Sequence, residues 1–156
     1  MVQYTKQFQD YWALTTKQLS LDDDTTQKFH ASLYDAYSEV QRHYHSIQHI
    51  VECLEHFHQI KTYLDDTISV ELAIWFHDVI YNPQANDNEQ QSADYSQTTL
   101  LFIQDSKKTR NNSSTESINH SLRLRLTHAH MCSIGFKSGL YAGSQRILCP
   151  CCSNNS

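Results

Sequence analysis

The chain has 156 residues, with 12 lysines and arginines against 17 aspartates and glutamates, and a net charge of −5. Its length suits one domain, and its acidic balance lacks the cationic surface that phosphate backbones select, so no nucleic-acid partner is predicted. No apolar run approaches the roughly 20 residues that span a bilayer, so we predict no membrane partner and expect a cytoplasmic protein. Only 3 glycines are present, which leaves few sites for tight hairpin turns and predicts an all-α fold.

Apolar residues recur at helical spacing in four successive segments. In the first, residues 2–19, Tyr4, Phe8 and Trp12 are four residues apart, as in an amphipathic helix that packs on a core. The polar break at residues 22–26 offers N-cap residues for the second segment. The next three segments carry these apolar stripes: Phe29, Leu33, Ala36 and Val40; Ile47, Ile50, Leu54, Phe57 and Leu64, from about Ser46; and Ile68, Val70, Leu72, Ala73, Ile74, Trp75, Phe76, Val79 and Ile80.

The fourth segment, residues 68–81, is apolar over almost its whole circumference, so we expect a central, buried helix that Asp65, Asp66 or Thr67 can cap. A loop at residues 82–88 follows, and Asp87 with Gln90 forms a capping-box variant that opens a helix to about residue 103. We therefore predict a helical domain at residues 1–104, followed by a polar linker at residues 105–116.

The composition changes after Glu116. Residues 1–116 hold all 17 acidic side chains and 8 basic ones, whereas residues 117–156 hold 4 basic side chains and no acidic one. We expect this tail to be irregular, either partly helical over about residues 116–130 or disordered. Two explanations of the composition stay open: a disordered terminus, and a change of coding frame after Glu116.

The 10 histidines draw attention because histidine is the commonest metal ligand. Residues 45, 49, 52 and 56 are three histidines and a glutamate spaced four, three and four apart, so they would share one face of a helix. His77 and Asp78 fall inside the apolar string ELAIWFHDVIY, where an ionised carboxylate is unfavourable unless it is compensated. A divalent cation would satisfy both residues, with a facing helix giving a further ligand. The alternative is a buried pair that only forms hydrogen bonds.

The strings RHYHSIQHI, ELAIWFHDVIY and NDNEQQSA, in this order, resemble one branch of the HD superfamily of metal-dependent phosphohydrolases, over about residues 10–104. The resemblance implies an HD-domain-like helical bundle that holds one or two divalent cations. It also implies attack of metal-bound hydroxide on a small phosphoester, such as a nucleotide. Mixed imidazole and carboxylate ligands suit manganese, iron, zinc, cobalt or nickel, with magnesium at a second, oxygen-rich position.

The resemblance also implies roles for individual residues. His77 and Asp78 become metal ligands, with a histidine of YHSIQH as the third. The similar YHN-x-x-H helix of cyclic-nucleotide phosphodiesterases makes His45 the general acid and His49 the ligand, which is the assignment we favour. Simpler HD members would instead make His45 the ligand, so that choice stays open.

For three further residues, a role at the metal site and a role outside it both stay open. Asp87 and Glu89 would support catalysis near the metal, or only cap and stabilise their helix. Arg42 would bind a substrate phosphate, or form a surface ion pair. The aspartate that closes the family's metal site has no counterpart after Glu116. The alternative to an enzyme is therefore a truncated, catalytically impaired HD-like protein that binds a nucleotide or a protein.

Overall fold

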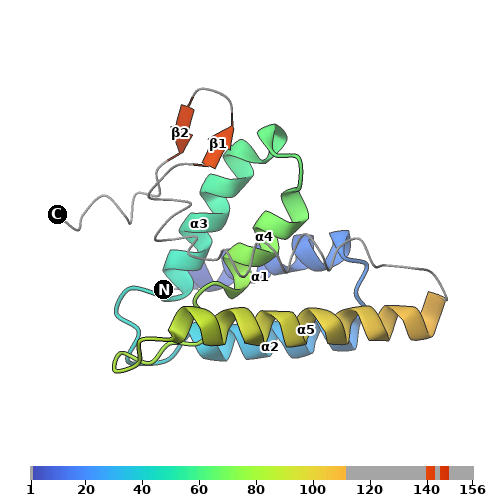
Figure 1. Ribbon diagram of the computed structural model, residues 1–156, viewed down its shortest axis with the longest axis horizontal. Helices are drawn as coiled ribbons and strands as arrows, with labels where there is room; N and C mark the ends of the chain where they lie inside the picture. Colours follow the sequence, from blue (N-terminus) through green and yellow to red (C-terminus); the bar gives the residue numbers. More distant parts are fainter. Residues whose placement is uncertain (1, 112–139, 143–144, 148–156) are drawn as a thin grey trace.

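The computed structural model describes residues 2–111, 140–142 and 145–147, with side chains for residues 3–103. The helices in this part are α1 (Val2–Gln18), α2 (Asp23–Tyr37), α3 (Ile47–Ile60), α4 (Thr67–Phe76) and α5 (Asn88–Asn111), with the 3-10 turn η1 (Lys61–Tyr63) after α3. The predicted all-α fold is confirmed for residues 2–111 (Figure 1). Among the described helices, none has both the length and the apolar character of a membrane span.

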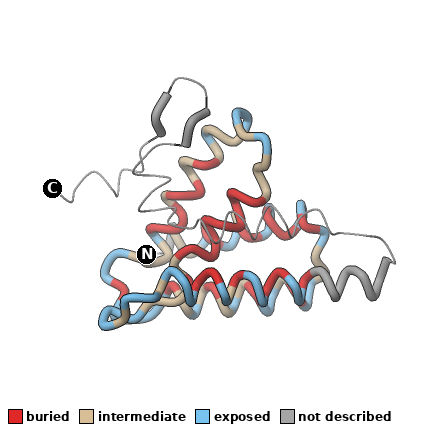
Figure 2. The backbone as a smooth tube through the Cα atoms, viewed as in Figure 1, coloured by how far each residue is buried: buried red, intermediate tan, exposed pale blue. Residues whose placement is uncertain are grey.

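The core lies around α4, as its sequence predicts. Residues 69–76 of this helix are all buried, and α1 packs against both α3 and α4 (Figure 2). The Trp75 ring meets the rings of Phe8 and Trp12 edge-on, with centroids 4.9 Å and 5.1 Å away. Two large aromatic residues of α1 therefore hold α4 in the centre of the bundle.

Among the cap residues that the sequence offers at 22–26 and 65–67, Asp22 and Asp66 are the N-caps. The Asp22 carboxylate accepts the backbone N–H of Thr25 at 2.8 Å, and the Asp66 carboxylate accepts that of Ser69 at 3.1 Å. Each cap satisfies a backbone donor that has no partner within the helix.

Three predicted helical stretches end or begin elsewhere. Helix α2 stops at Tyr37, so Val40 is 94% exposed and does not belong to its buried stripe. Helix α3 begins at Ile47, close to the expected start, but ends at Ile60, and η1 follows it before Leu64. Helix α4 stops at Phe76 rather than at Tyr81, because the N–H of Val79 turns back to the carbonyl of Phe76 at 3.3 Å. Each difference arises where the chain turns although the apolar pattern continues.

The second half of the chain differs more from the prediction. Helix α5 continues to Asn111, so residues 105–111 are helical rather than a linker. The sequence of this stretch includes Lys107, Lys108 and Arg110, residue types with high helix propensity. Strands β1 (Leu140–Ala142) and β2 (Gln145–Ile147) pair antiparallel, a hairpin that the expected irregular tail does not include. The predicted helix at residues 116–130 lies outside the described residues.

Candidate metal centre

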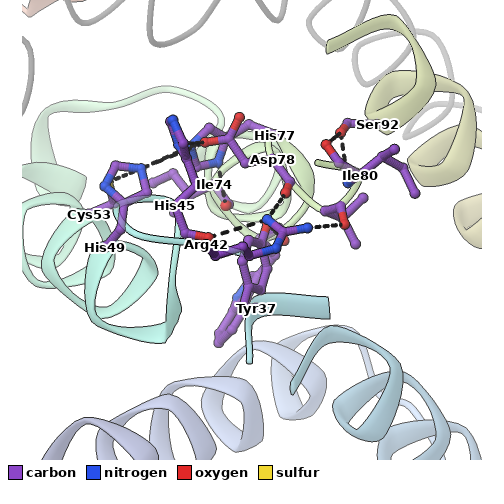
Figure 3. A network of polar contacts seen from close by, with 12 residues as sticks. Tyr37, Arg42, His45, His49, Cys53, Ile74, His77, Asp78, Ile80 and Ser92 are labelled. Atoms are coloured by element: carbon purple, nitrogen blue, oxygen red, sulfur yellow. Dashed lines mark hydrogen bonds and ion pairs between the residues drawn. The ribbon is translucent and has the colours of Figure 1, made fainter. Parts of the chain in front are cut away.

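Three imidazoles converge on one carboxylate oxygen, Oδ2 of Asp78 (Figure 3). It lies 2.6 Å from His45 Nδ1, 2.9 Å from His77 Nε2 and 3.8 Å from His49 Nε2. The Nε2 atoms of His49 and His77 are 3.2 Å apart. His45, His49 and Asp78 each offer a ligand atom within 4.8 Å of the others, so this group could hold a metal ion. Ligands around a tetrahedral zinc ion, roughly 2 Å from the metal, have similar mutual separations.

The four residues come from two segments that are far apart in the sequence. His45 precedes α3 and His49 lies in its first turn, whereas His77 and Asp78 follow the last turn of α4. The predicted single helical face carrying residues 45, 49, 52 and 56 does not form, because His45 is not helical. His45 reaches the site from the irregular segment instead.

The His77 ring is held by a backbone contact on its far side. Its Nδ1 lies 2.8 Å from the carbonyl oxygen of Ile74. A carbonyl only accepts, so Nδ1 carries a proton, and Nε2 is the ring nitrogen that faces His49 and Asp78. Metal-binding histidines commonly donate their second ring N–H to a backbone carbonyl in this way.

The centre is buried on one side and open on the other. The His49 and His77 side chains are 3% and 7% exposed, whereas His45 is 31% exposed. The half-exposed Tyr44 ring lies beside both His45 and His49, at centroid distances of 5.3 Å and 5.1 Å. A small molecule would therefore approach from the His45 side.

The protonation states suit a cation. Burial, together with the charges of His77 and His45, lowers the pKa of His49 to about 3 against the opposing effect of Asp78. Burial alone would raise the pKa of the Asp78 carboxyl, but the charges and hydrogen bonds of His77 and His45 hold it well below its ordinary range. Near neutral pH, His49 is neutral and Asp78 is ionised, which are the forms that bind metal.

This shift predicts acid sensitivity of the metal-free protein. Below pH 6.5 the unfolded chain takes up a proton at His49, whereas the folded chain does so only at about pH 3, so stability falls as the pH falls. From pH 6.5 to pH 5 the loss attributable to His49 is up to about 2 kcal/mol. Urea unfolding with a chelator measures it as the difference between wild type and His49→Gln.

The slope of His49→Gln must be subtracted from that of the wild type, because other histidines also make stability fall as the pH falls. Burial lowers the pKa values of His30 and His58 as well. Asp78 contributes little in this window, since its folded and unfolded pKa values both lie below it. Equal slopes for wild type and His49→Gln would contradict the predicted effect.

Arg42 is placed differently from both predictions made for it. Its side chain is 0% exposed, and its guanidinium donates to the backbone carbonyls of His45, Asp78 and Val79. This placement favours neither a phosphate contact nor a surface ion pair, although Glu39 does accept from Nε at 2.9 Å.

Asp87 and Glu89 are exposed where α5 begins, and they do not belong to the His45, His49 and Asp78 group. The Asp87 carbonyl accepts the backbone N–H of Gln91 and its carboxylate accepts the Gln91 side-chain amide, both at 2.9 Å. The contacts of these side chains are not those of the predicted capping box, because the Asp87 carboxylate meets the Gln91 side chain and the Gln90 amide donates to Asp94.

A second buried carboxylate, Glu71 in α4, is 1% exposed and was not among the predicted site residues. It accepts from the Thr15 hydroxyl at 2.7 Å and from the Gln18 amide at 3.3 Å, and His58 Nε2 lies 3.7 Å away. The criterion that selected Asp78, an acid within an apolar run, would also have selected Glu71. Neutral donors satisfy Glu71, whereas imidazoles surround Asp78, so the surrounding side chains distinguish a core acid from a metal ligand.

Comparisons with models of protein families, with curated proteins and with solved structures found no match.

Proposed function

We propose that the protein is a metal-dependent phosphohydrolase of the HD type that acts on a small phosphoester, with nucleotides as the leading class. The observation that carries this proposal is the convergence of His45, His49 and His77 on the Asp78 carboxylate. The motifs that resemble the HD superfamily contain all four residues.

The chain's own groups divide into ligands and a proton donor. Nε2 of His49, Nε2 of His77 and the carboxylate of Asp78 would hold a divalent cation. Manganese, iron, zinc, cobalt and nickel suit this mixture of ligands. When bound, the cation lowers the pKa of water and polarises a phosphoester oxygen.

His45 has two alternative roles. Its Nδ1 is close enough to Asp78 to act as a further ligand, or its partly exposed position would let it protonate the leaving oxygen of a substrate. Asp87 and Glu89 would act on the site only through intervening water.

A second candidate is a catalytically impaired HD-like protein that binds a nucleotide or a protein partner. One observation favours it: the sequence has no acid after Glu116, where the family's closing aspartate would stand. Such a protein would keep the fold and a weaker cation site.

The test combines metal analysis with turnover of a generic phosphodiester, bis-p-nitrophenyl phosphate. We expect stoichiometric divalent metal and hydrolysis in the wild type, and a loss of at least roughly 100-fold in kcat/KM in His77→Ala. The matched control is His56→Ala, which removes an α3 histidine outside the cluster and should leave both readouts unchanged.

Bound metal without turnover in the wild type would favour the binding protein. Folded protein that binds no metal after reconstitution would contradict the metal site itself. Turnover that survives in His77→Ala would show that the hydrolysis does not depend on this centre.

A further inference from the structure

Arg42 lies in the irregular segment between α2 and α3, and the protein encloses its guanidinium, with 0% of the side chain exposed. An arginine remains charged in proteins, so burying it is unfavourable unless its N–H groups find acceptors. The acceptors therefore identify the chain segments that this side chain links.

Three of these acceptors are backbone carbonyls on the two segments that build the metal centre. Nη1 donates to the carbonyl of His45 at 3.2 Å and to that of Asp78 at 2.6 Å, and Nη2 donates to the carbonyl of Val79 at 2.9 Å. Figure 3 shows the guanidinium between these carbonyls, beneath the imidazoles. One planar group thus links the backbone before α3 to the turn after α4.

Two aromatic rings and one carboxylate hold the guanidinium in place. Its central carbon lies 5.2 Å from the ring centroids of both Tyr37 and Tyr81, within the range of cation–π attraction. Glu39 accepts from Nε at 2.9 Å and compensates the charge. The guanidinium is therefore fixed before any ligand arrives.

We infer that Arg42 is a positioning residue, which fixes the backbone of His45 and Asp78 so that their side chains meet at the metal centre. The inference rests on the proposed metal site. Ligand geometry in such sites must be held to roughly 0.5 Å, and groups behind the ligands supply that precision. The role is neither of the two alternatives that the sequence left open, a substrate phosphate contact and a surface ion pair.

Arg42→Lys is the sharpest variant, because lysine keeps the positive charge but cannot reach three carbonyls with one nitrogen. We expect its affinity for cobalt(II), measured on the full chain from the visible absorbance of the bound ion, to fall at least roughly ten-fold. Glu39→Gln removes the charge of the Nε acceptor but keeps an amide oxygen there and leaves the three carbonyl contacts, so its affinity should fall by clearly less than that of Arg42→Lys.

A destabilised control separates positioning from general loss of stability. Phe29 is a buried residue of α2, distant in sequence from all four candidate ligands, and Phe29→Leu should lower the melting temperature. It should bind cobalt(II) with wild-type affinity even where its melting temperature matches that of Arg42→Lys. A proportional loss of affinity in both variants would overturn the inference.

A second readout needs no metal. In the metal-free protein, the ¹⁵N resonances of the His45 imidazole report on its 2.6 Å contact with Asp78. We expect Arg42→Lys to shift these resonances while those of His56 keep their wild-type positions. Unchanged His45 resonances together with unchanged cobalt affinity would overturn the inference.

This readout also separates the two proposals. A wild type that binds no cobalt(II) contradicts the proposed function, whereas a His45 shift in Arg42→Lys would still support positioning by Arg42. If Arg42→Lys does not unfold cooperatively, Arg42→Gln takes its place in both measurements. Failure of both variants to fold would make Arg42 a folding residue and would also overturn the inference.

Discussion

Replacing Asp78 with asparagine is expected to weaken binding of zinc or manganese at least 100-fold, a loss of about 3 kcal/mol. Asparagine keeps the shape of the side chain but removes the charge, and Asp78 is the acid on which His45, His49 and His77 converge. Titration calorimetry of chelator-treated protein with each metal measures the change.

The matched control is Asp35→Asn, an exposed acid on α2. It changes the net charge by the same amount, so it should alter metal affinity by less than about two-fold. Wild-type affinity in Asp78→Asn, or a similar loss in Asp35→Asn, would contradict the role of Asp78 as the anionic ligand.

Trp75→Ala is expected to have the largest effect on stability, lowering the free energy of unfolding by roughly 3–5 kcal/mol. Its ring is fully buried between Phe8 and Trp12, and its Nε1 donates to the Thr15 hydroxyl at 2.9 Å. The variant loses the packing of the ring. It also loses the indole N–H that donates to the Thr15 hydroxyl, and that hydroxyl in turn donates to Glu71.

Urea unfolding of the full chain at pH 7, with chelator present, measures this loss. Tyr63→Ala is the control, because that aromatic side chain belongs to a residue 74% exposed on η1 and its removal should change stability by no more than about 0.5 kcal/mol. A cost below about 1 kcal/mol for Trp75→Ala would contradict a core centred on α4.

The sequence predicted the helices in the first hundred residues because apolar periodicity is a local signal. The caps at Asp22 and Asp66 followed from the same local chemistry. The pattern did not predict the end of α4, since the apolar residues continue through Val79 and Ile80 after the helix has stopped at Phe76. That end depends on how the turn is bonded, which periodicity does not encode.

The side chains of the candidate centre could be predicted from the sequence, but the backbone contacts that hold them could not. The motifs contain His45, His49, His77 and Asp78, and these side chains do meet. The burial of Arg42 could not be predicted, because it depends on carbonyls 36 and 37 residues away in the sequence. Sequence spacing identifies side chains that share a helix, whereas a buried guanidinium is satisfied by distant backbone.

The early end of α4 leaves two carbonyl groups for other uses. In a continuing helix, the carbonyls of Ile74 and Trp75 would accept N–H groups four residues further on. Here the ring of His77 contacts the first and the hydroxyl of Tyr37 donates to the second. The end of this helix thus gives one oxygen to the ring of His77 and the other to Tyr37, so the same break in the backbone orients an imidazole and ties α2 to α4.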